Sequence, residues 1–598
     1  MAERIPNRCD VPSEYKWAIE DIYADDAAWE SSFQNAKGFV ERIAEFKGQL
    51  SSAKKLYEYM ILEDKMTVTF DSLVNYAQRK NDEDTARSEY QDMTARVEKL
   101  YVEISEAAAF VTPELLAIPD ENMWGFYKTC PGLELYRRVI DNIRRKRAHI
   151  LSEAEERLLA LTGEMAGSPD TIYSMFSDAD LKFPDAYDKD GNAHQVTHGS
   201  YTTLVKSPDR VLRKSAFDSM YHTYESFRNT AAAVLSSQVK TLVFRAKARK
   251  YDNTLQAALD GTEVPESVYH SLIEAVHDNM EYMYKYVRLR KKLLGLDELH
   301  VYDLYTPIVP DADMKIPFEE AWQEVYESLA PMGDEYREIF KKGMKQHWID
   351  IYENVGKRSG AYSAGARVHP FVLLNYKDTL ESEFTLAHEM GHAIHSYLSN
   401  ENQPICYSDY VIFVAEVAST CNESLLMQSL LKKTTDKKRR AYLINYFLEQ
   451  FRTTLYRQTM FAEFELMINR KAENGESLTA DALCEMYRGL NKLYYGEDII
   501  IDSELDMEWA RIPHFYYNYY VYQYSTGFSA AIALSERILK EGAGAVKDYI
   551  GFLSSGSSAD PITLLKGAGV DMTSKKPVSD ALGLFNTLID ELEGLMTD

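Results

Sequence analysis

FTLAHEMGHAIH, residues 384–395, gathers three histidines and a glutamate within eight residues, although the whole chain has only 13 histidines among 598 residues. At 100° of rotation per residue, His388, His392 and His395 fall within about 40–60° of one another on a helix. An apolar stripe runs beside them, formed by Leu380, Ala387, Gly391, Ile394 and Leu398. The three histidines are therefore expected to border the buried face of a helix rather than to point straight into solvent.

A capping pattern indicates where this helix begins. Asp378 stands three residues before Glu381, and polar residues with this spacing commonly open a helix. We therefore expect one helix over residues 378–399, DTLESEFTLAHEMGHAIHSYLS. Apolar residues with helical spacing fill most of the remaining chain, notably residues 26–128 and 207–250, so the sequence predicts a mostly α fold.

Two interruptions of the helical pattern predict β structure. Within residues 181–204, Asp190-Gly191 lies between two short extended stretches, which is typical of a β-hairpin, with an irregular surface loop as the alternative. The apolar run 367–378, RVHPFVLLNYKD, has a proline near its start and predicts a strand, or an edge strand, before the histidine helix. Gly360 lies in a glycine-containing loop that precedes this strand.

Two histidines four residues apart on a helix can bind one metal ion, because both imidazoles reach it at Zn–N distances of about 2.0–2.1 Å. His388 and His392 have this spacing, and Glu389 lies where its carboxylate can accept a proton from an attacking water. This H-E-x-x-H pattern predicts one zinc ion per chain. A helix that is merely rich in histidine is the alternative.

A catalytic zinc ion usually has three protein ligands, so a third is needed. Glu416 stands in the apolar helical run 409–431, where an unpaired carboxylate is costly to bury and a metal ion would relieve that cost. A salt bridge to an arginine or lysine is the alternative for Glu416. His395 is the rival ligand, but three ligands from under three turns of one helix would strain a tetrahedral site. Glu423 is expected either to accept a hydrogen bond from a ligand histidine or to be exposed.

Composition restricts the classes of partner. The chain has 67 lysines and arginines against 93 aspartates and glutamates, and its net charge of −26 would repel nucleic acid and anionic membranes. No stretch has the pattern of a signal peptide or approaches the roughly 20 apolar residues that span a bilayer. Five cysteines without a CxxC pair are typical of a reducing compartment. We therefore expect a cytoplasmic protein that binds neither nucleic acid nor membrane.

The motifs HEMGHAIH and IFVAEVASTCNE together resemble the thimet-type oligopeptidase family (M3) of zinc metallopeptidases, and within it the oligoendopeptidase F subfamily. RCDVPSEYKW, residues 357–392 and HFYYNYYVYQYSTG resemble the same subfamily, so the resemblance covers nearly the whole chain. It implies a helical zinc-peptidase fold with a deep substrate channel and a small β-sheet beside the active-site helix. It also implies that Glu416 is the third zinc ligand and that folded proteins are excluded.

The stretch HFYYNYYVYQY carries six tyrosines in eleven residues, which by composition alone indicates an aromatic core helix. In the resembling family, a histidine and tyrosines of this region stabilise the oxyanion that forms during peptide hydrolysis. His514, Tyr519 and Tyr522 match best, with Tyr522 ranked first. Tyr516 and Tyr517 match less well, because the spacing is shorter than in longer relatives, and they are expected to contact substrate.

The strand near residues 371–376 is expected to pair with an extended substrate, as strands at a sheet edge do. Leu373 and Asn375 of this strand, and Gly360 of the loop before it, are therefore candidate substrate contacts. We expect the loop glycines to let the loop close over the substrate.

These predictions describe a zinc metalloendopeptidase that cleaves internal bonds of short, unstructured oligopeptides, with Glu389 as the general base. Residues 1–200 are expected to form an N-terminal helical lobe that covers the channel, and residues 201–598 the zinc metallopeptidase catalytic domain. A zinc carboxypeptidase of similar helical architecture and a non-catalytic peptide-binding scaffold with a structural zinc are the alternatives.

Overall fold

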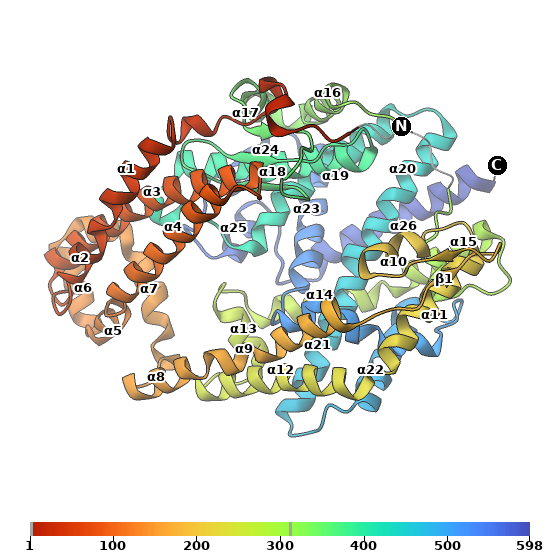
Figure 1. Cartoon of the computed structure of the whole chain (residues 1–598), viewed down its shortest axis with the longest axis horizontal. Helices are drawn as coiled ribbons and strands as arrows, with labels where there is room; N and C mark the ends of the chain where they lie inside the picture. The colour runs from red at the N-terminus through yellow and green to blue at the C-terminus, as the bar shows by residue number, and fades with distance from the viewer. Residues whose placement is uncertain (1–3, 310–313, 598) are drawn as a thin grey trace. The chain divides into compact units, whose positions relative to one another are not determined.

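The computed structural model describes residues 4–309 and 314–597, and helices make up most of them (Figure 1). The chain separates into two compact units, each assembled from three stretches of sequence. The first unit consists of residues 1–148, 314–428 and 534–569; the second consists of residues 149–313, 429–533 and 570–598. The predicted mostly α fold class is confirmed.

The first unit contains the helix of the histidine motif and the helices that support it. Within this unit lie α1 (Asp26–Ala36), α2 (Gly38–Ala44), α3 (Ala53–Glu83), α4 (Ser88–Ala107), α5 (Val111–Ala117), α6 (Asp120–Thr129), α7 (Arg137–Arg145), α16 (Phe318–Ser328), α17 (Gly333–Lys345), α18 (Leu380–Asn402), the start of α19 (Ile412–Lys433), α24 (Ala543–Leu553) and α25 (Pro561–Gly567). The histidine motif lies wholly within α18.

The second unit contains the tyrosine-rich segment. Within it lie α8 (Glu153–Leu161), α9 (Gly163–Ser174), α10 (His198–Val205), α11 (Arg210–Glu225), α12 (Arg228–Ala248), α13 (Thr254–Asp260), α14 (Glu266–Asp278), α15 (Met280–Leu294), α20 (Lys437–Gln450), α21 (Arg457–Glu473), α22 (Ala480–Tyr495), the start of α23 (Tyr522–Glu541) and α26 (Lys576–Thr597). The tyrosine-rich segment leads directly into α23.

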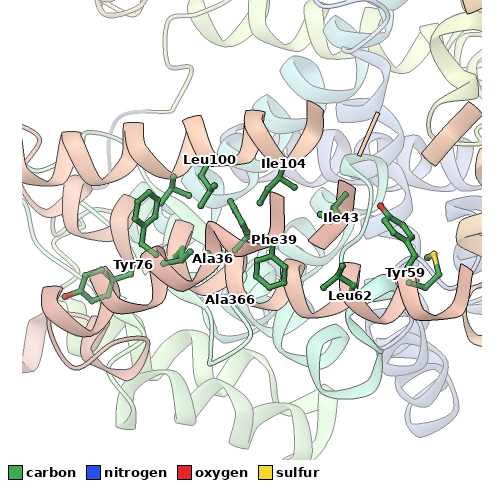
Figure 2. Close-up of a cluster of buried hydrophobic side chains, with 14 of the residues drawn as sticks. Ala36, Phe39, Ile43, Tyr59, Leu62, Tyr76, Leu100, Ile104 and Ala366 are labelled. Carbon is green, nitrogen blue, oxygen red and sulfur yellow. The ribbon is translucent and has the colours of Figure 1, made fainter. Parts of the chain in front are cut away.

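The N-terminal helices of the first unit share an apolar core. Figure 2 shows part of it, with side chains of α1–α4 that lie toward one another: Ala36, Phe39, Ile43, Tyr59, Leu62, Tyr76, Leu100 and Ile104. The same cluster includes Ala366, Phe371 and Leu373, which come from the neighbourhood of the sheet. Burial of this apolar surface therefore holds the sheet and the N-terminal helices together, at roughly 25 cal/mol per Å² removed from water.

A three-stranded sheet with strand order β3-β5-β4 precedes α18 in the chain. Its strands are β3 (Ile349–Asp350), β4 (Tyr362–Ala364) and β5 (Phe371–Leu373). β5 pairs in parallel with β3, in the register Ile349 with Val372, and antiparallel with β4, in the register Ser363 with Val372. The predicted strand is confirmed, and it begins directly after Pro370.

An ion-pair network fixes the sheet and its following loop. Lys357 is buried, and its Nζ lies 2.7 Å from Asp350 Oδ1 of β3, while Arg8 pairs with the other carboxylate oxygen at 2.5 Å. Lys357 also donates to the Leu374 carbonyl at 2.5 Å. The start of the chain, the sheet and the glycine loop are therefore linked through one carboxylate.

The predicted β-hairpin is also confirmed. β1 (Ala186–Tyr187) pairs antiparallel with β2 (Ala193–His194), and Asp190-Gly191 lies in the connecting turn. Gly191 adopts a φ of 83°, a left-handed conformation that glycine reaches without steric cost. The turn chemistry therefore agrees with the pairing of the strands.

The cap of α18 differs from the prediction by one residue. Thr379, rather than Asp378, is the N-cap, because its hydroxyl oxygen accepts a hydrogen bond from the Ser382 backbone at 3.2 Å. Thr379 has the extended backbone that a cap residue needs, with φ −129° and ψ 157°. The helix then continues to Asn402, three residues beyond the predicted end.

The apolar segments and the cysteines of the sequence can be compared with the structure. Across residues 4–309 and 314–597, no helix combines the length and the apolar character that crossing a bilayer requires. The five cysteines are free thiols, and Cys421 and Cys484 are buried. Cys421 and Cys484 thus take part in core packing.

Candidate active site

Helices α18 and α19 approach closely where the two candidate metal motifs face each other. A β-carbon at Gly391 would lie 2.7 Å from the Ser419 α-carbon and 2.8 Å from the Ala418 carbonyl oxygen, closer than real β-carbons approach such atoms. Asn422 also links the helices, because its amide donates to the Ala387 carbonyl at 3.2 Å. The absence of a side chain at Gly391 therefore permits the contact on which the site depends.

This contact brings together the three predicted metal ligands. Glu416 Oε2 lies 3.4 Å from His388 Nε2 and 3.8 Å from His392 Nε2. One ligand atom from each residue lies within 4.8 Å of the others. Ligand atoms of a tetrahedral zinc ion with bonds of about 2.0–2.1 Å are about 3.3–3.4 Å apart, so the separation of Glu416 from His388 matches this spacing and all three donor types suit zinc.

Neighbouring polar groups orient the three side chains. His388 Nδ1 is hydrogen-bonded to Glu423 Oε1 at 2.5 Å, which leaves the other ring nitrogen, Nε2, facing Glu416. Ser419 donates from its hydroxyl to Glu416 Oε2 at 3.2 Å. Ligand histidines in metalloproteins are commonly oriented by a carboxylate in this way. Glu423 thus lies against a candidate ligand and not in open solvent.

Burial and neighbouring charges set the protonation of the two histidines in the metal-free protein. Burial lowers the pKa of His388, but the hydrogen bond and charge of Glu423 outweigh it and raise the pKa to about 9. Burial holds the pKa of His392 well below its ordinary value, and the charge of His388 acts in the same direction. A cation bound here must therefore displace a proton from His388.

Glu389 is the carboxyl group inside the histidine motif. Its side chain is largely buried, at 7% exposure, and burial raises its pKa to about 7 against the opposing effect of His388. A carboxyl group with a pKa near neutrality can both accept and release a proton. Its position on α18, about 100° from His388, places it beside the ligand group without belonging to it.

His395 occupies a different environment from the other two histidines. Its ring stacks on Tyr410, with centroids 3.7 Å apart and an interplanar angle of 9°. Burial lowers its pKa to about 3, and its Nδ1 has no hydrogen-bond partner among the residues that the structure describes. The described ligand atoms that converge belong to His388, His392 and Glu416. The structure therefore groups Glu416, and not His395, with the two histidines.

A pocket of about 470 Å³ borders the N-terminal end of α18. Gly360 and Asn375, both predicted substrate contacts, line it together with Glu381 and Thr385 of the helix. The Asn375 amide donates to the Gly360 carbonyl at 2.8 Å, which ties the glycine loop to the end of β5. Thr385 precedes His388 by three residues, so the pocket lies about one helical turn from the ligand group.

Leu373 does not lie on a free strand edge. β5 is the central strand of its sheet, with β3 on one side and β4 on the other, and Leu373 is fully buried. The expectation that this strand pairs with an extended substrate is therefore wrong. Three consecutive fully buried residues, Phe371–Leu373, are typical of a central strand rather than an edge. β3 and β4 are the two edge strands of this sheet, so an added strand would pair with one of them instead.

The predicted oxyanion donors belong to the second unit. His514 lies in the short helix η12 (Pro513–Tyr516) and is half-buried. Its ring centroid lies 6.4 Å from that of Tyr520 and 6.0 Å from that of Tyr524. Two tyrosines that the sequence comparison did not rank therefore flank the histidine. Tyr520 lies before the start of α23, so helical spacing in the sequence does not predict its position beside His514.

The tyrosines that the sequence ranked higher lie in a buried cluster. Tyr519 and Tyr522 are each 2% exposed and pack on Tyr269, with ring centroids 5.6 Å and 5.1 Å from it. The Tyr519 hydroxyl is hydrogen-bonded to the Thr254 hydroxyl at 2.9 Å. In this structure both rings are part of the packing that supports the segment.

Tyr516 and Tyr517 differ strongly in exposure. Tyr516 stacks on Tyr173, with centroids 4.4 Å apart, and is nearly buried. Tyr517 is 51% exposed, and its ring centroid lies 5.5 Å from that of His514. Of this pair, Tyr517 is therefore the one accessible to a substrate.

The helical fold and the H-E-x-x-H pattern define a class of protein, the helical peptidases. The model described as Peptidase family M3 matches residues 203–584, and the model described as Oligopeptidase F matches residues 114–183. The chain belongs to peptidase family M3 and is a peptidase, as the sequence resemblance implied.

Relatives of known name and known structure agree with this assignment. The chain is 46% identical to Oligopeptidase PepF of Bacillus subtilis, across 100% of this chain and 89% of the relative. It is similar to the crystal structure of oligoendopeptidase-F from Enterococcus faecium, with a TM-score of 0.74, 36% identity and coverage of 96% and 99% of the two chains. A Chlamydophila abortus protein of known structure matches with a TM-score of 0.94 and 35% identity, across 99% of this chain and 100% of that one.

Proposed function

We propose that this protein is a zinc-dependent endopeptidase that hydrolyses internal bonds of short, unstructured peptides. The observation that carries the proposal is the convergence of His388, His392 and Glu416 beside the buried Glu389, in a chain of peptidase family M3. Relatives named as oligopeptidases and oligoendopeptidases support the substrate class.

One zinc ion per chain suits a donor set of two imidazoles and one carboxylate. When bound, it would supply Lewis-acid polarisation of the attacking water and of the scissile carbonyl. Glu389 accepts the proton of the attacking water and returns it to the leaving nitrogen, a task for which a carboxyl pKa of about 7 is well matched. Glu423 keeps His388 oriented, and His395 packs behind the site.

His514 and neighbouring tyrosines donate hydrogen bonds to the oxyanion that develops on the scissile carbonyl. The family resemblance ranks Tyr522 first and Tyr519 next to it, but both rings are buried in this structure. The rings that flank His514 make Tyr520 and Tyr524 further candidates. Burial lowers the pKa of His514, so the imidazole is neutral at pH 7 and offers one N–H donor.

Candidate substrate contacts are a pocket, two tyrosines and a strand. The pocket lined by Gly360 and Asn375 takes a substrate side chain close to the scissile bond. Tyr517 and Tyr516 are candidate contacts from the second unit. An extended peptide backbone pairs with β4, one of the two edge strands of the sheet.

Exclusion of folded proteins follows from a deep channel covered by an N-terminal helical lobe, residues 1–200. Residues 201–598 form the catalytic domain in this scheme, and the family model that begins at residue 203 supports this division. The substrates that suit such an enzyme are cytoplasmic peptides that have already lost their fold.

Replacement of Glu389 by glutamine tests the proposal directly, because it keeps the size of the side chain and removes the proton acceptor. We expect the zinc content to remain at one ion per chain while turnover of a quenched-fluorescence peptide falls about 10²–10⁴-fold. Glu401→Gln is the matched control, since Glu401 lies exposed near the other end of α18. Unchanged turnover in Glu389→Gln, or turnover by wild-type protein freed of metal, contradicts the proposal.

A peptide blocked at both ends separates the two enzymatic alternatives. An endopeptidase cleaves it internally, whereas a carboxypeptidase needs a free terminal carboxylate. Mass spectrometry of the products therefore distinguishes them in a single assay. A peptide-binding scaffold with a structural zinc would leave both blocked and free peptides intact.

A further inference from the structure

The segment that connects His514 to α23 turns through two consecutive left-handed residues. Asn518 has a φ of 57° and Tyr519 a φ of 55°. Neither is glycine, and the left-handed conformation is sterically unfavourable for an L-residue, with asparagine among the more tolerant. Such conformations persist where surrounding contacts hold them, and they gather at functional sites. The contacts around this pair therefore determine the path of the segment.

A buried carboxyl group holds the second of these residues. Glu465 of α21 is 1% exposed, and its Oε1 accepts a hydrogen bond from the Tyr519 backbone N–H at 2.6 Å. Its Oε2 has no hydrogen-bond partner among the residues that the structure describes. Burial raises the pKa of Glu465 to about 8, which reflects the cost of enclosing it. Burial of the Glu465 carboxyl group is thus energetically costly, and the hydrogen bond that it accepts comes from the left-handed turn.

The end of the segment at Ser525 is held by the stretch of chain that leads into α21. The π-helical stretch η10 (Phe451–Tyr456) runs directly into α21, and the Ser525 hydroxyl of α23 donates to the Leu455 carbonyl at 3.1 Å. π-helical turns leave backbone carbonyls out of register and occur frequently at functional sites. Tyr520 and Tyr524 therefore lie between two anchors, at Tyr519 and Ser525, that both lead back to α21 and its start.

We propose that Glu465 is a positioning residue for peptide hydrolysis: its hydrogen bond to Tyr519 holds the left-handed turn that sets His514 beside Tyr520 and Tyr524. The inference rests on the proposed function, because this arrangement affects turnover only if these side chains act on the scissile carbonyl. Glu465 itself acts through the backbone of the turn.

The test separates loss of the hydrogen bond from relief of strain in the left-handed turn. Glu465→Ala removes the acceptor, and we expect kcat to fall about 10–100-fold, part of what removal of one oxyanion donor costs. Zinc content and KM should stay near the wild-type values. Glu465→Gln keeps an acceptor oxygen and should retain kcat within about threefold. Glu465→Ala combined with Asn518→Gly should regain most of the loss, because glycine adopts a positive φ without steric cost.

Glu463→Ala is the matched control, because Glu463 lies on the same helix but contacts His277 and Tyr494, each at 2.8 Å. It should leave the kcat of the folded, zinc-loaded enzyme unchanged. An equal loss in Glu463→Ala would show general damage to α21 and would overturn the inference. Failure of Asn518→Gly to restore kcat would overturn the role of strain.

Amide hydrogen exchange gives a readout that does not depend on activity. Residues 515–524 should exchange faster in Glu465→Ala than in wild type, and the Glu463→Ala variant should match wild type there. Unchanged exchange and unchanged kcat in Glu465→Ala, together with a collapse of turnover in Glu389→Gln, would overturn this inference and leave the proposed function intact. A wild-type protein that cleaves no peptide would overturn both.

Discussion

The two helices that carry the candidate metal ligands and the tyrosine-rich segment position their side chains by different means. His388, His392 and Glu416 project from two regular helices, α18 and α19, whose backbones nearly touch at Gly391. The stretch from His514 to Tyr524 is instead irregular, with a short helical turn, two left-handed residues and the first turn of α23.

This difference explains where sequence spacing is informative. In a regular helix each residue turns by about 100°, so spacing alone states which side chains share a face. In the irregular segment the backbone dihedrals change from residue to residue, and neighbouring tyrosines face different surroundings. Tyr519 and Tyr522 pack on Tyr269, whereas Tyr520 and Tyr524 flank His514. Packing between α18 and α19 fixes the positions of the candidate ligands. The tyrosine-rich segment is instead held by contacts with other elements of the chain.

The largest effect is expected from the helix pair. Glu416→Ala removes one of three converging ligand atoms, so zinc should be lost and peptide turnover should fall to background. His395→Ala is the comparison variant, because His395 packs on Tyr410 and lies outside the ligand group. It should keep most of its zinc. Metal content by elemental analysis and turnover in the same samples check both, and reversed results would make His395 the ligand.

In the tyrosine-rich segment we expect a smaller effect. Tyr520→Phe and Tyr524→Phe each remove a hydroxyl near His514, and removal of one oxyanion donor typically lowers kcat by about 10²–10³. Tyr522→Phe should reduce folding stability more than kcat if its buried position persists during turnover. Steady-state kinetics and thermal unfolding of the three variants provide the measurement. A collapse of kcat in Tyr522→Phe alone would restore the ranking made from sequence.

The hydrogen bond that orients His388 provides an intermediate test. Glu423→Gln keeps the shape of the side chain and removes its charge, so zinc affinity should fall about 10–100-fold. Competition with a chelator of known affinity measures this change. Glu401→Gln, at an exposed position on α18, should bind zinc as wild type does. Equal affinities in both variants would mean that packing alone orients the ligand.

The smallest expected effect concerns the anchor of the irregular segment. Burial raises the pKa of Glu465 from an ordinary value of 4.5 to about 8, so the folded protein holds this proton more tightly than the unfolded chain. Its contribution to stability is therefore fully present below about pH 4.5 and is lost as the pH rises toward about 8.

Glu465→Gln carries no such proton, so wild type should lose stability relative to this variant between pH 5 and pH 8. The expected loss is at least about 1 kcal/mol, the value of one pKa unit. Urea unfolding of both proteins at the two pH values measures it. A stability difference that does not change with pH would show that Glu465 titrates normally.

The helical fold and the convergence of the three candidate ligands were predictable because both depend on periodicity and on burial. Glu416 was identified by the cost of a carboxylate in an apolar helix, and the structure brings it to the two histidines. The central position of β5 was missed, because a three-residue strand carries too little pattern to distinguish an edge from a centre. The cap at Thr379 was missed by one residue for a similar reason, since two adjacent polar residues can both serve as a cap.

The positions of Tyr520 and Tyr524 could not be read from the sequence, because they depend on a backbone conformation at Asn518 and Tyr519 that no propensity favours strongly. The role of Glu465 could not be predicted from the sequence for the same reason. Its partner is a backbone N–H that becomes available only in that turn, 54 residues further along the chain.

The close contact at Gly391 has a consequence for transplanting this chemistry into other proteins. A designer who copied only the two histidines, the base and the distant glutamate onto a new helix pair would transfer the side chains without the close approach of the two helix backbones. One additional methyl group at position 391 would meet the opposing backbone at 2.7 Å, and the carboxylate would stop short of its partners. The site therefore requires that position 391 has no β-carbon.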